Sequence, residues 1–204
     1  MGKNRIVTKA LSLIICAAGI AVVAGWLYDV PALRSISPAW ISMKFSTAIA
    51  FVASGISLYF IARSQEGGFE AAQIMLSMTS LFIAILMGLM LFSGIFGVRT
   101  GIEDLFVNDP GGTASVEPGR PSMPTMVNFL LLAVAAILTI LNPARLLPKL
   151  KAIGIIISAI GALAVTGYIF KAPALYYYAA GLNSAMAMPT AVLFVLMGAG
   201  LLCL

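Results

Sequence analysis

Six long apolar runs limit what this 204-residue chain can fold into. They lie at about 8–28, 43–63, 72–97, 124–142, 149–170 and 183–204. A helix needs about 20 apolar residues to cross a bilayer core roughly 30 Å thick, and the runs are close to that length. Only 9% of the residues are charged, whereas a soluble domain carries about 25%. The sequence therefore predicts an integral membrane protein, as does a mean hydropathy of +1.07.

The six spans are expected to be α-helices, because hydrocarbon offers no partner for unpaired backbone N–H and C=O groups. A transmembrane barrel would need segments of about ten residues with alternating polarity, and these runs have no two-residue period. The basic N-terminus followed by an apolar run also fits a secretory signal. The run from Ala10 to Tyr28 is long enough to span, however. We expect an all-α protein with six transmembrane helices in one membrane domain, 1–204, the first helix being retained.

Lysine and arginine indicate the orientation, because they accumulate in short cytoplasmic loops. The side that holds both termini has seven basic residues near span ends: Lys3, Arg5, Lys9, Arg63, Arg145, Lys149 and Lys151. The other side has five, spread over longer loops that include 98–123: Arg34, Lys44, Arg99, Arg120 and Lys171. We therefore expect both termini to be cytoplasmic. The net charge of +5 is explained by topology, and no basic helix face indicates nucleic-acid binding.

The chain lacks the side chains that most catalytic and metal sites need. It has no histidine, which removes the commonest metal ligand and the usual proton shuttle at neutral pH. Cys16 and Cys203 lie at opposite ends without metal-ligand spacing. The turn at Pro110–Thr113 has neither the preceding strand nor the lysine of a phosphate loop. The spans hold almost no ionisable groups, which disfavours a pump. We expect no catalysis, no metal and no cofactor, apart from an optional bound lipid or quinone.

Four acidic side chains are assigned to the outer loops: Asp29, Glu103, Asp104 and Asp109. Carboxylates of this kind can gather a calcium ion, but their spacing matches no known ion loop. We interpret them as solvated loop residues.

One stripe of residues recurs three times at four-residue spacing, which places its members on one helix face. The copies are Met43, Thr47, Phe51, Gly55; Pro121, Thr125, Phe129, Ala133; and Met186, Thr190, Phe194, Gly198. Each copy begins an even-numbered span, just after an outer loop. All three helices would therefore enter the membrane from outside.

A second motif also recurs. The segment "GWLYDVPAL" at 25–33 matches "GYIFKAPAL" at 167–175, and the offset of 142 residues is within one residue of that between Thr47 and Thr190. The middle copy keeps only "GIF" at Gly94–Phe96. We predict three parallel-repeat helical hairpins, covering about 8–63, 72–142 and 149–204. This differs from the inverted repeats of many transporters. Whether equivalent residues surround a common axis or lie in a row stays open.

Two interpretations of the stripe stand side by side. In the first, its small residues and threonines hold helices together, as is common in membranes. In the second, threonine hydroxyls and phenylalanine rings line an outer pocket for a small or amphipathic ligand such as a lipid or quinone. Asn128, the most polar side chain deep in a span, fits either a helix–helix hydrogen bond or a ligand contact. The outer aromatic residues suit an interfacial belt or a docking surface: Trp26, Tyr28, Trp40, Tyr176, Tyr177 and Tyr178.

The segments "GWLYDVPALRSISPAWISMKFSTAIAFVASGISL" and "PGRPSMPTMVNFLLLAVAAIL" resemble a bacterial module. It is the multi-span N-terminal membrane region of PAS, histidine kinase and diguanylate cyclase proteins. Its pattern is aromatic-hydrophobic-Asp-hydrophobic-Pro, then Met-x-x-x-Thr-Ala and a Phe-rich helix. The matching residues are Asp29, Pro31, Met43, Thr47, Ala48 and Phe51. The run at 186–202 is similar to its closing segment. The resemblance implies a sensory input domain in the bacterial cytoplasmic membrane.

The 204 residues differ from that family in one respect, because no output domain follows the last span. We expect either an excised module or a separate subunit that acts through helix packing with a partner. The sequence favours a non-catalytic sensory or regulatory membrane module, whose partners are lipids, other membrane subunits or a separate signalling protein. The alternative is a structural accessory subunit of a respiratory or photosynthetic complex. A small facilitator for a neutral solute is the third interpretation.

Overall fold

The computed structural model describes residues 2–37, 40–67, 69–103, 107, 118–142, 144–179 and 183–204. The elements are α1 (Gly2–Leu27), α2 (Pro31–Arg34), α3 (Phe45–Ser64), α4 (Phe69–Phe96), α5 (Met123–Leu141), α6 (Leu146–Ile169), the 3₁₀ helix η1 (Pro173–Tyr176) and α7 (Met188–Leu202). This part of the chain contains no strand, only an isolated bridge between Ala179 and Asn183. Five helices, α1, α3, α4, α5 and α6, are long and apolar enough to cross a membrane. The chain is therefore an all-α protein of membrane type.

The last predicted span differs from the structure. The sequence predicts 183–204, whereas α7 covers only the 15 residues Met188–Leu202. The backbone before α7 is paired with the preceding loop, since the Met186 N–H donates to Tyr176 O at 2.9 Å and Asn183 bridges to Ala179. Pro189 then stands at the start of the helix, where a missing N–H costs nothing. Hydrophobicity alone does not reveal this extended entry.

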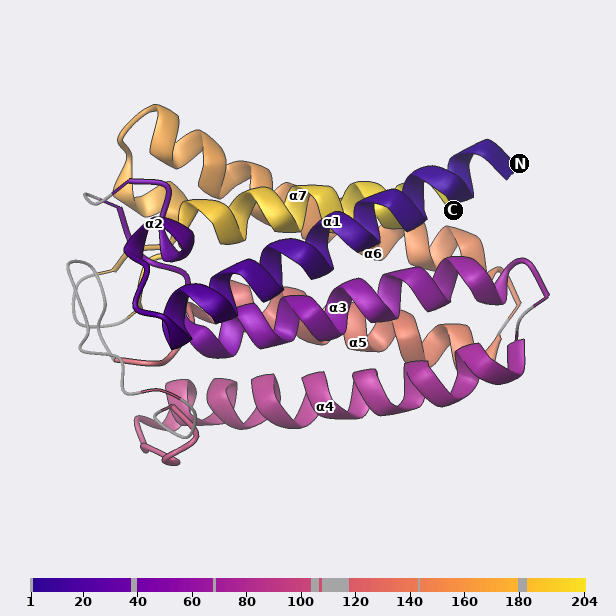
Figure 1. Ribbon diagram of the computed structural model, residues 1–204, viewed down its shortest axis with the longest axis horizontal. Coiled ribbons are helices and arrows are strands. Elements are labelled where there is room, and N and C mark those ends of the chain that lie inside the picture. The colour runs from indigo at the N-terminus through magenta and orange to yellow at the C-terminus, as the bar shows by residue number, and fades with distance from the viewer. Residues whose placement is uncertain are drawn as a thin grey trace.

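The long helices lie side by side along one axis and pack as three successive pairs (Figure 1). The pairs are α1 with α3, α4 with α5, and α6 with α7. Between pairs, α3 contacts α4, α5 contacts α6, and α7 contacts α1, while α3 also contacts α5 and α7. The spanning window of α3 is 67% buried, against 33% in α1 and α6. Thus α3 lies inside the bundle, and both termini lie at one end of it (Figure 1).

The helices α3, α5 and α7 begin with the same backbone geometry. Their N-cap residues Lys44, Ser122 and Ala187 have φ/ψ of −67°/150°, −64°/150° and −64°/146°. None of the three makes a side-chain cap hydrogen bond. Because the stripe threonine always comes three residues after the cap, the three stripes start at the same depth in their helices.

Glycines allow close backbone contact within the first and third pairs. A Cβ added to Gly19 would lie 2.8 Å from Ala48 O, and one added to Gly161 would lie 2.7 Å from Ala191 O. Gly55 lies equally close to α1, because a Cβ added to it would lie 2.7 Å from Ser12 O. Gly198 packs against the backbone of α6 at Gly154 and against the Ser158 hydroxyl. Small residues let helices approach in this way, which is how membrane helices gain packing energy.

The segments 25–33 and 167–175 have nearly the same backbone structure. Asp29 and Lys171 both adopt a left-handed conformation with φ 52°. In each segment the N–H of the next residue returns to the carbonyl of the glycine in the last turn of the helix: Val30 to Gly25 and Ala172 to Gly167, both at 2.8 Å. A one-turn helix that begins with proline follows in both, α2 and η1. The shared motif therefore encodes one helix-ending turn.

The aromatic residue of each motif fixes this turn to the start of the next inner helix. Trp26 Nε1 donates to Met43 O at 2.9 Å, and Tyr168 Oη donates to Met186 O at 2.8 Å. Met43 is the first residue of one stripe and Met186 the first of another. The motif therefore positions the stripe, which follows it directly in the chain.

Candidate functional site

The three stripe phenylalanines meet in the centre of the bundle. The ring centroids of Phe51 and Phe129 are 4.8 Å apart, and each lies 5.0 Å from the centroid of Phe194. All three side chains are fully buried. Their interplanar angles of 50° to 67° give the tilted and edge-to-face arrangements that aromatic pairs prefer. One residue from each of α3, α5 and α7 thus forms a closed aromatic cluster.

A small cavity lies one helical turn nearer the loops that precede α3, α5 and α7, where the stripe threonines gather. Thr47, Thr125 and Thr190 all line it, and each is only 2% exposed. The cavity has a volume of about 10 Å³, which is room for about one water molecule. We call it the axial cavity. Its other lining residues come from the segments just before α3, α5 and α7: Ile41, Ser42, Lys44, Arg120, Pro121, Ser122, Ala185 and Ala187.

The threonine hydroxyls differ in their hydrogen bonding. Thr125 Oγ1 shares a hydrogen bond of 2.8 Å with Ser122 Oγ. Within the described part of the chain, the hydroxyls of Thr47 and Thr190 have no hydrogen-bond partner, although both line the cavity. A buried hydroxyl normally finds a partner. The axial cavity is therefore supplied with unused hydrogen-bonding groups.

The size of the axial cavity bears on the predicted lipid or quinone pocket. A quinone ring or an acyl chain does not fit into about 10 Å³, and the phenylalanine cluster fills the axis beneath it. Binding of such a ligand between the stripes would require α3, α5 and α7 to separate. In the structure as it stands, the site takes only a particle of about the size of water.

Asn128 lies at the centre of the bundle without the helix–helix hydrogen bond that the sequence suggests. It is fully buried, and neither its amide oxygen nor its amide nitrogen has a hydrogen-bond partner. Asn128 directly precedes Phe129, and the residues that precede the other two cluster phenylalanines are the apolar Ala50 and Leu193. It does not line the axial cavity. Away from the axial cavity, Ser54 Oγ is the other described side-chain atom that is buried and unpartnered.

The outer aromatic residues do not form one exposed surface. Trp26 is buried at 8% exposure, with the Arg34 guanidinium 4.7 Å from its ring centroid, so it belongs to the packing and not to a surface belt. Tyr28 is 79% exposed and suits an interfacial position. Trp40 packs 5.2 Å from Tyr168, which the sequence analysis did not single out.

The tyrosine run is held in the third hairpin. Tyr176 stacks on Tyr168 at 4.5 Å between centroids. Tyr177 Oη donates to Ile160 O at 3.0 Å, and burial raises the pKa of this phenol above its ordinary value of 10.0. Tyr178 is partly exposed. The rings of Trp40, Tyr168 and Tyr176 join the loop after α2 to the end of α6. A partner would therefore contact mainly Tyr28 and the exposed edge of Trp40.

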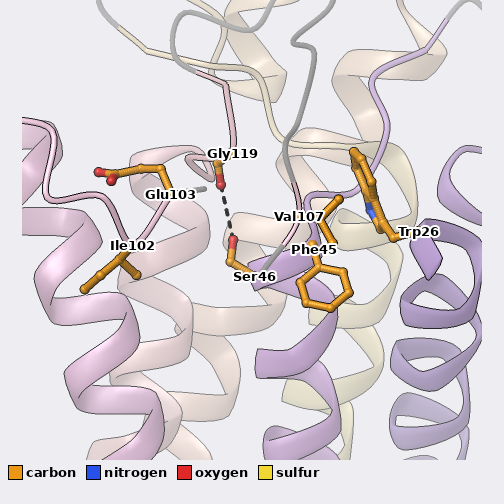
Figure 2. A pocket seen from close by; sticks show the side chains of 7 residues that line it. All are labelled: Trp26, Phe45, Ser46, Ile102, Glu103, Val107 and Gly119. Carbon is orange, nitrogen blue, oxygen red and sulfur yellow. Dashed lines mark hydrogen bonds between the residues drawn. The ribbon is translucent and has the colours of Figure 1, made fainter. Parts of the chain in front are cut away.

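The two ends of the loop between α4 and α5 meet near the start of α3. Ser46 Oγ donates to Gly119 O at 3.3 Å, and the pocket there is bordered by the rings of Trp26 and Phe45 (Figure 2). Gly119 has φ +74°, and a Cβ on it would collide with the Glu103 carbonyl, so only glycine fits. Figure 2 shows the Glu103 carboxylate directed away from the two rings.

Glu103 is 5% exposed and bonded to Ser93 and Thr100. Burial raises the pKa of this carboxyl, but hydrogen bonds from Ser93, from its own backbone and from Thr100 outweigh burial, so the pKa lies below its ordinary value of 4.5. Asp29 pairs with Arg34 at 2.6 Å. Asp104 and Asp109 lie outside the described residues. Among those described, no three His, Cys, Asp or Glu side chains gather as for a metal.

Lys44, Arg120 and Ser122 line the axial cavity, but the sequence does not identify them as site residues. Lys44 and Ser122 could have been found from their position, because each is an N-cap three residues before a stripe threonine. No protein-family model, curated protein or solved structure matches the chain. Its function is therefore argued from the geometry of the site, the distribution of basic residues and the resemblance that the sequence carries.

Proposed function

We propose that the chain is a non-catalytic sensory or regulatory membrane module, in which the spacing of α3, α5 and α7 carries the signal. The observation that supports this most is the axial cavity directly above the closed cluster of Phe51, Phe129 and Phe194. A packed core does not deform continuously and instead moves between discrete arrangements. A ligand that enters the cavity would therefore displace the rings, and with them the three helices.

The proposed architecture is three parallel-repeat hairpins closed around one axis, with six spans. The cyclic order of contacts supports it, since α3 packs on α4, α5 on α6, and α7 on α1. So does the matching geometry of segments 25–33 and 167–175. The 15 residues of α7 rise about 22 Å at 1.5 Å per residue. The extended residues before α7 would complete the sixth crossing.

The proposed orientation places the axial cavity toward the outside and both termini in the cytoplasm of a bacterial cell. The seven basic residues near one set of span ends support it, because such residues favour the cytoplasmic side. A signal would then pass from the outer ends of the inner helices to their inner ends at Ser64, Leu141 and Leu202. There it would act on a membrane subunit or a separate signalling protein, as the resemblance to bacterial sensor regions implies.

Replacing all three stripe threonines by valine tests this function. The T47V/T125V/T190V variant keeps the shape of the side chains and removes the hydroxyls. A sensory module loses its response while the protein still reaches the membrane in normal amounts. The readout is the output of the signalling partner that co-purifies from native membranes. If yield and stability fall but the response does not change, the stripe serves packing alone.

The same purification tests the accessory-subunit alternative. Recovery with a signalling protein supports the proposal. Stoichiometric recovery in a large respiratory or photosynthetic complex contradicts it and supports the structural role.

A further inference from the structure

We infer that the axial cavity binds a small inorganic anion of about the size of a halide ion. This inference rests on the proposed function only in taking the cavity as the ligand site of the module. Two basic residues, Lys44 and Arg120, contribute to the lining, and the Arg120 guanidinium extends to α4, where Nη1 donates to Ser93 Oγ at 3.5 Å. Lys44 is only 6% exposed. Among the described residues, no acidic side chain lines the cavity, and Glu103 is reached from Arg120 only through the Ser93 hydroxyl.

The ends of three helices add to this positive potential. α3, α5 and α7 all begin at the cavity, since their N-caps Lys44, Ser122 and Ala187 line it. The first N–H in each helix that returns to the cap carbonyl comes four residues later, as in Ala48 to Lys44 at 3.0 Å. The earlier N–H groups have no acceptor within the helix. Helix N-termini attract anions for this reason and through the helix dipole.

Two threonine hydroxyl groups that line the cavity have no hydrogen-bond acceptor among the described residues. Thr47 and Thr190 are each 98% buried, counting from their 2% exposure, and line the cavity. Neither hydroxyl has a hydrogen-bond partner in the described part of the chain. A threonine hydroxyl can donate one hydrogen bond, and an unmet buried polar group costs free energy. Two donors on two different helices, lining one small cavity, are suited to an anion between them.

The volume selects the class of anion. Room for about one water molecule, at about 10 Å³, limits the ligand to about a single atom. A phosphate group or the head group of a lipid is several times larger and would force the threonines apart. A metal cation is disfavoured by the two basic side chains. A halide, chloride being the one abundant in cells, satisfies both charge and size.

Bromide provides the direct test, because its anomalous scattering locates the ion. Crystals of the full chain grown with bromide should show an anomalous peak between Thr47 and Thr190. In detergent, replacing gluconate by chloride or bromide at constant ionic strength should raise the Tm, because a ligand that binds only the folded state stabilises it. No peak in the cavity, or equal Tm values in gluconate and halide, would overturn the inference, since water alone then fills the site.

Matched variants assign the effect to the cavity. T47V/T190V and K44M should each weaken the apparent halide affinity at least about tenfold, the equivalent of 1.4 kcal/mol. T139V is the control, since Thr139 is 1% exposed but its hydroxyl already donates to Ala135 O at 2.8 Å. An equal loss in T139V would contradict the assignment, and the wild-type bromide map decides the matter if a variant fails to fold. These measurements need no signalling partner, so halide binding without any response would refute the sensory function and leave the anion site standing.

Discussion

The first and third hairpins are alike in detail, whereas the middle hairpin shares only their inner helix. In the first and third hairpins, a glycine lies in the last turn of the first helix, a left-handed residue follows the helix end, and an aromatic side chain donates to the carbonyl of the first stripe residue. In the middle hairpin, Ile95 stands next to Gly94 as Trp26 and Tyr168 stand next to their glycines, and it is 62% exposed. The stripe of the middle hairpin nevertheless reaches the same cluster through Phe129.

This difference separates two roles in the molecule. The turn motif fixes one way of entering the bundle, and the middle hairpin achieves the same entry by other contacts, such as the Met123 N–H to Asn183 Oδ1 at 3.1 Å. The stripe has no such substitute, because the cluster needs one ring from each inner helix. Changes in the stripe should therefore affect all three hairpins, and changes in the turn only one.

The largest effect is expected from removing a ring of the cluster. Phe51→Ala, Phe129→Ala and Phe194→Ala should each lower the free energy of unfolding by about 3–5 kcal/mol, because each leaves a cavity in a fully buried core. Unfolding in mixed micelles measures it. Phe92→Ala is the control, since Phe92 is 50% exposed. If Phe129→Ala cost far less than the other two, the middle hairpin would not belong to the cluster as an equal member.

The next effect distinguishes the helix contacts of the third hairpin from those of the middle one. Gly198→Ala should lower the free energy of unfolding by about 1–3 kcal/mol, since overpacking forces the backbone to shift. Its added Cβ would meet Gly154 O and Ser158 Oγ. Gly88→Ala in α4 meets nothing within 4 Å and should stabilise the helix by about 0.5–1 kcal/mol. Equal effects of the two changes would contradict the close α6–α7 contact.

Asn128 marks a further difference of the middle hairpin. Asn128→Leu should raise the free energy of unfolding by about 1–3 kcal/mol, because an unpaired buried amide costs free energy. The equivalent positions, Ala50 and Leu193, are apolar. Leu193→Met is a suitable volume-conserving control, expected to change stability by less than about 1.5 kcal/mol. Destabilisation by Asn128→Leu would mean that the amide has a partner in the membrane.

Smaller losses are expected in the turns. Trp26→Phe and Tyr168→Phe each remove one hydrogen bond to the carbonyl before a stripe, worth about 0.5–1.5 kcal/mol. Tyr28→Phe should have no measurable effect, since Tyr28 is 79% exposed. Similar losses at Trp26 and Tyr168 would support equivalent roles for the two turns, and a loss at only one would break the likeness between the first and third hairpins.

The smallest effect concerns acid stability in the outer loop of the middle hairpin. The pKa of Glu103 is lowered in the folded state, so its stabilising contribution is present above the ordinary value of 4.5 and is lost as the pH falls through the lowered pKa. Glu103→Gln should lower the Tm at neutral pH, where the ionised carboxylate stabilises the fold, and flatten the acid side of the Tm–pH profile so that the two profiles converge at low pH. A variant profile parallel to the wild type below pH 4.5 would show that Glu103 does not titrate in this range.

The sequence predicts the individual helices well, but it does not predict which helix faces pack against one another. Periodicity places Thr47 and Phe51 on one face, because that depends only on 3.6 residues per turn. It does not say that this face meets Phe129 and Phe194, because closure of the bundle depends on packing between distant segments. The start of α7 at Met188 is also hidden, since residues 185–187 directly before it are apolar and continue the hydrophobic run.

The axial cavity shows the same limit for the site. A lysine at a span end is expected to extend toward the head groups, yet Lys44 is buried beside the threonines. Trp26 likewise is of a residue type that is common at membrane interfaces, yet it is buried in the core. Both outcomes follow from how the outer loop folds over the inner helices, which local sequence patterns do not determine.

Cross-linking of the stripe threonines tests most directly that the three stripes surround one axis. In a background with Cys16 and Cys203 replaced by serine, cysteines are introduced pairwise at positions 47, 125 and 190 and treated with a short bridging reagent in native membranes. Closure around an axis predicts that all three pairs cross-link with similar yield. Two pairs that cross-link while the third does not would mean stripes in a row, and would contradict the account.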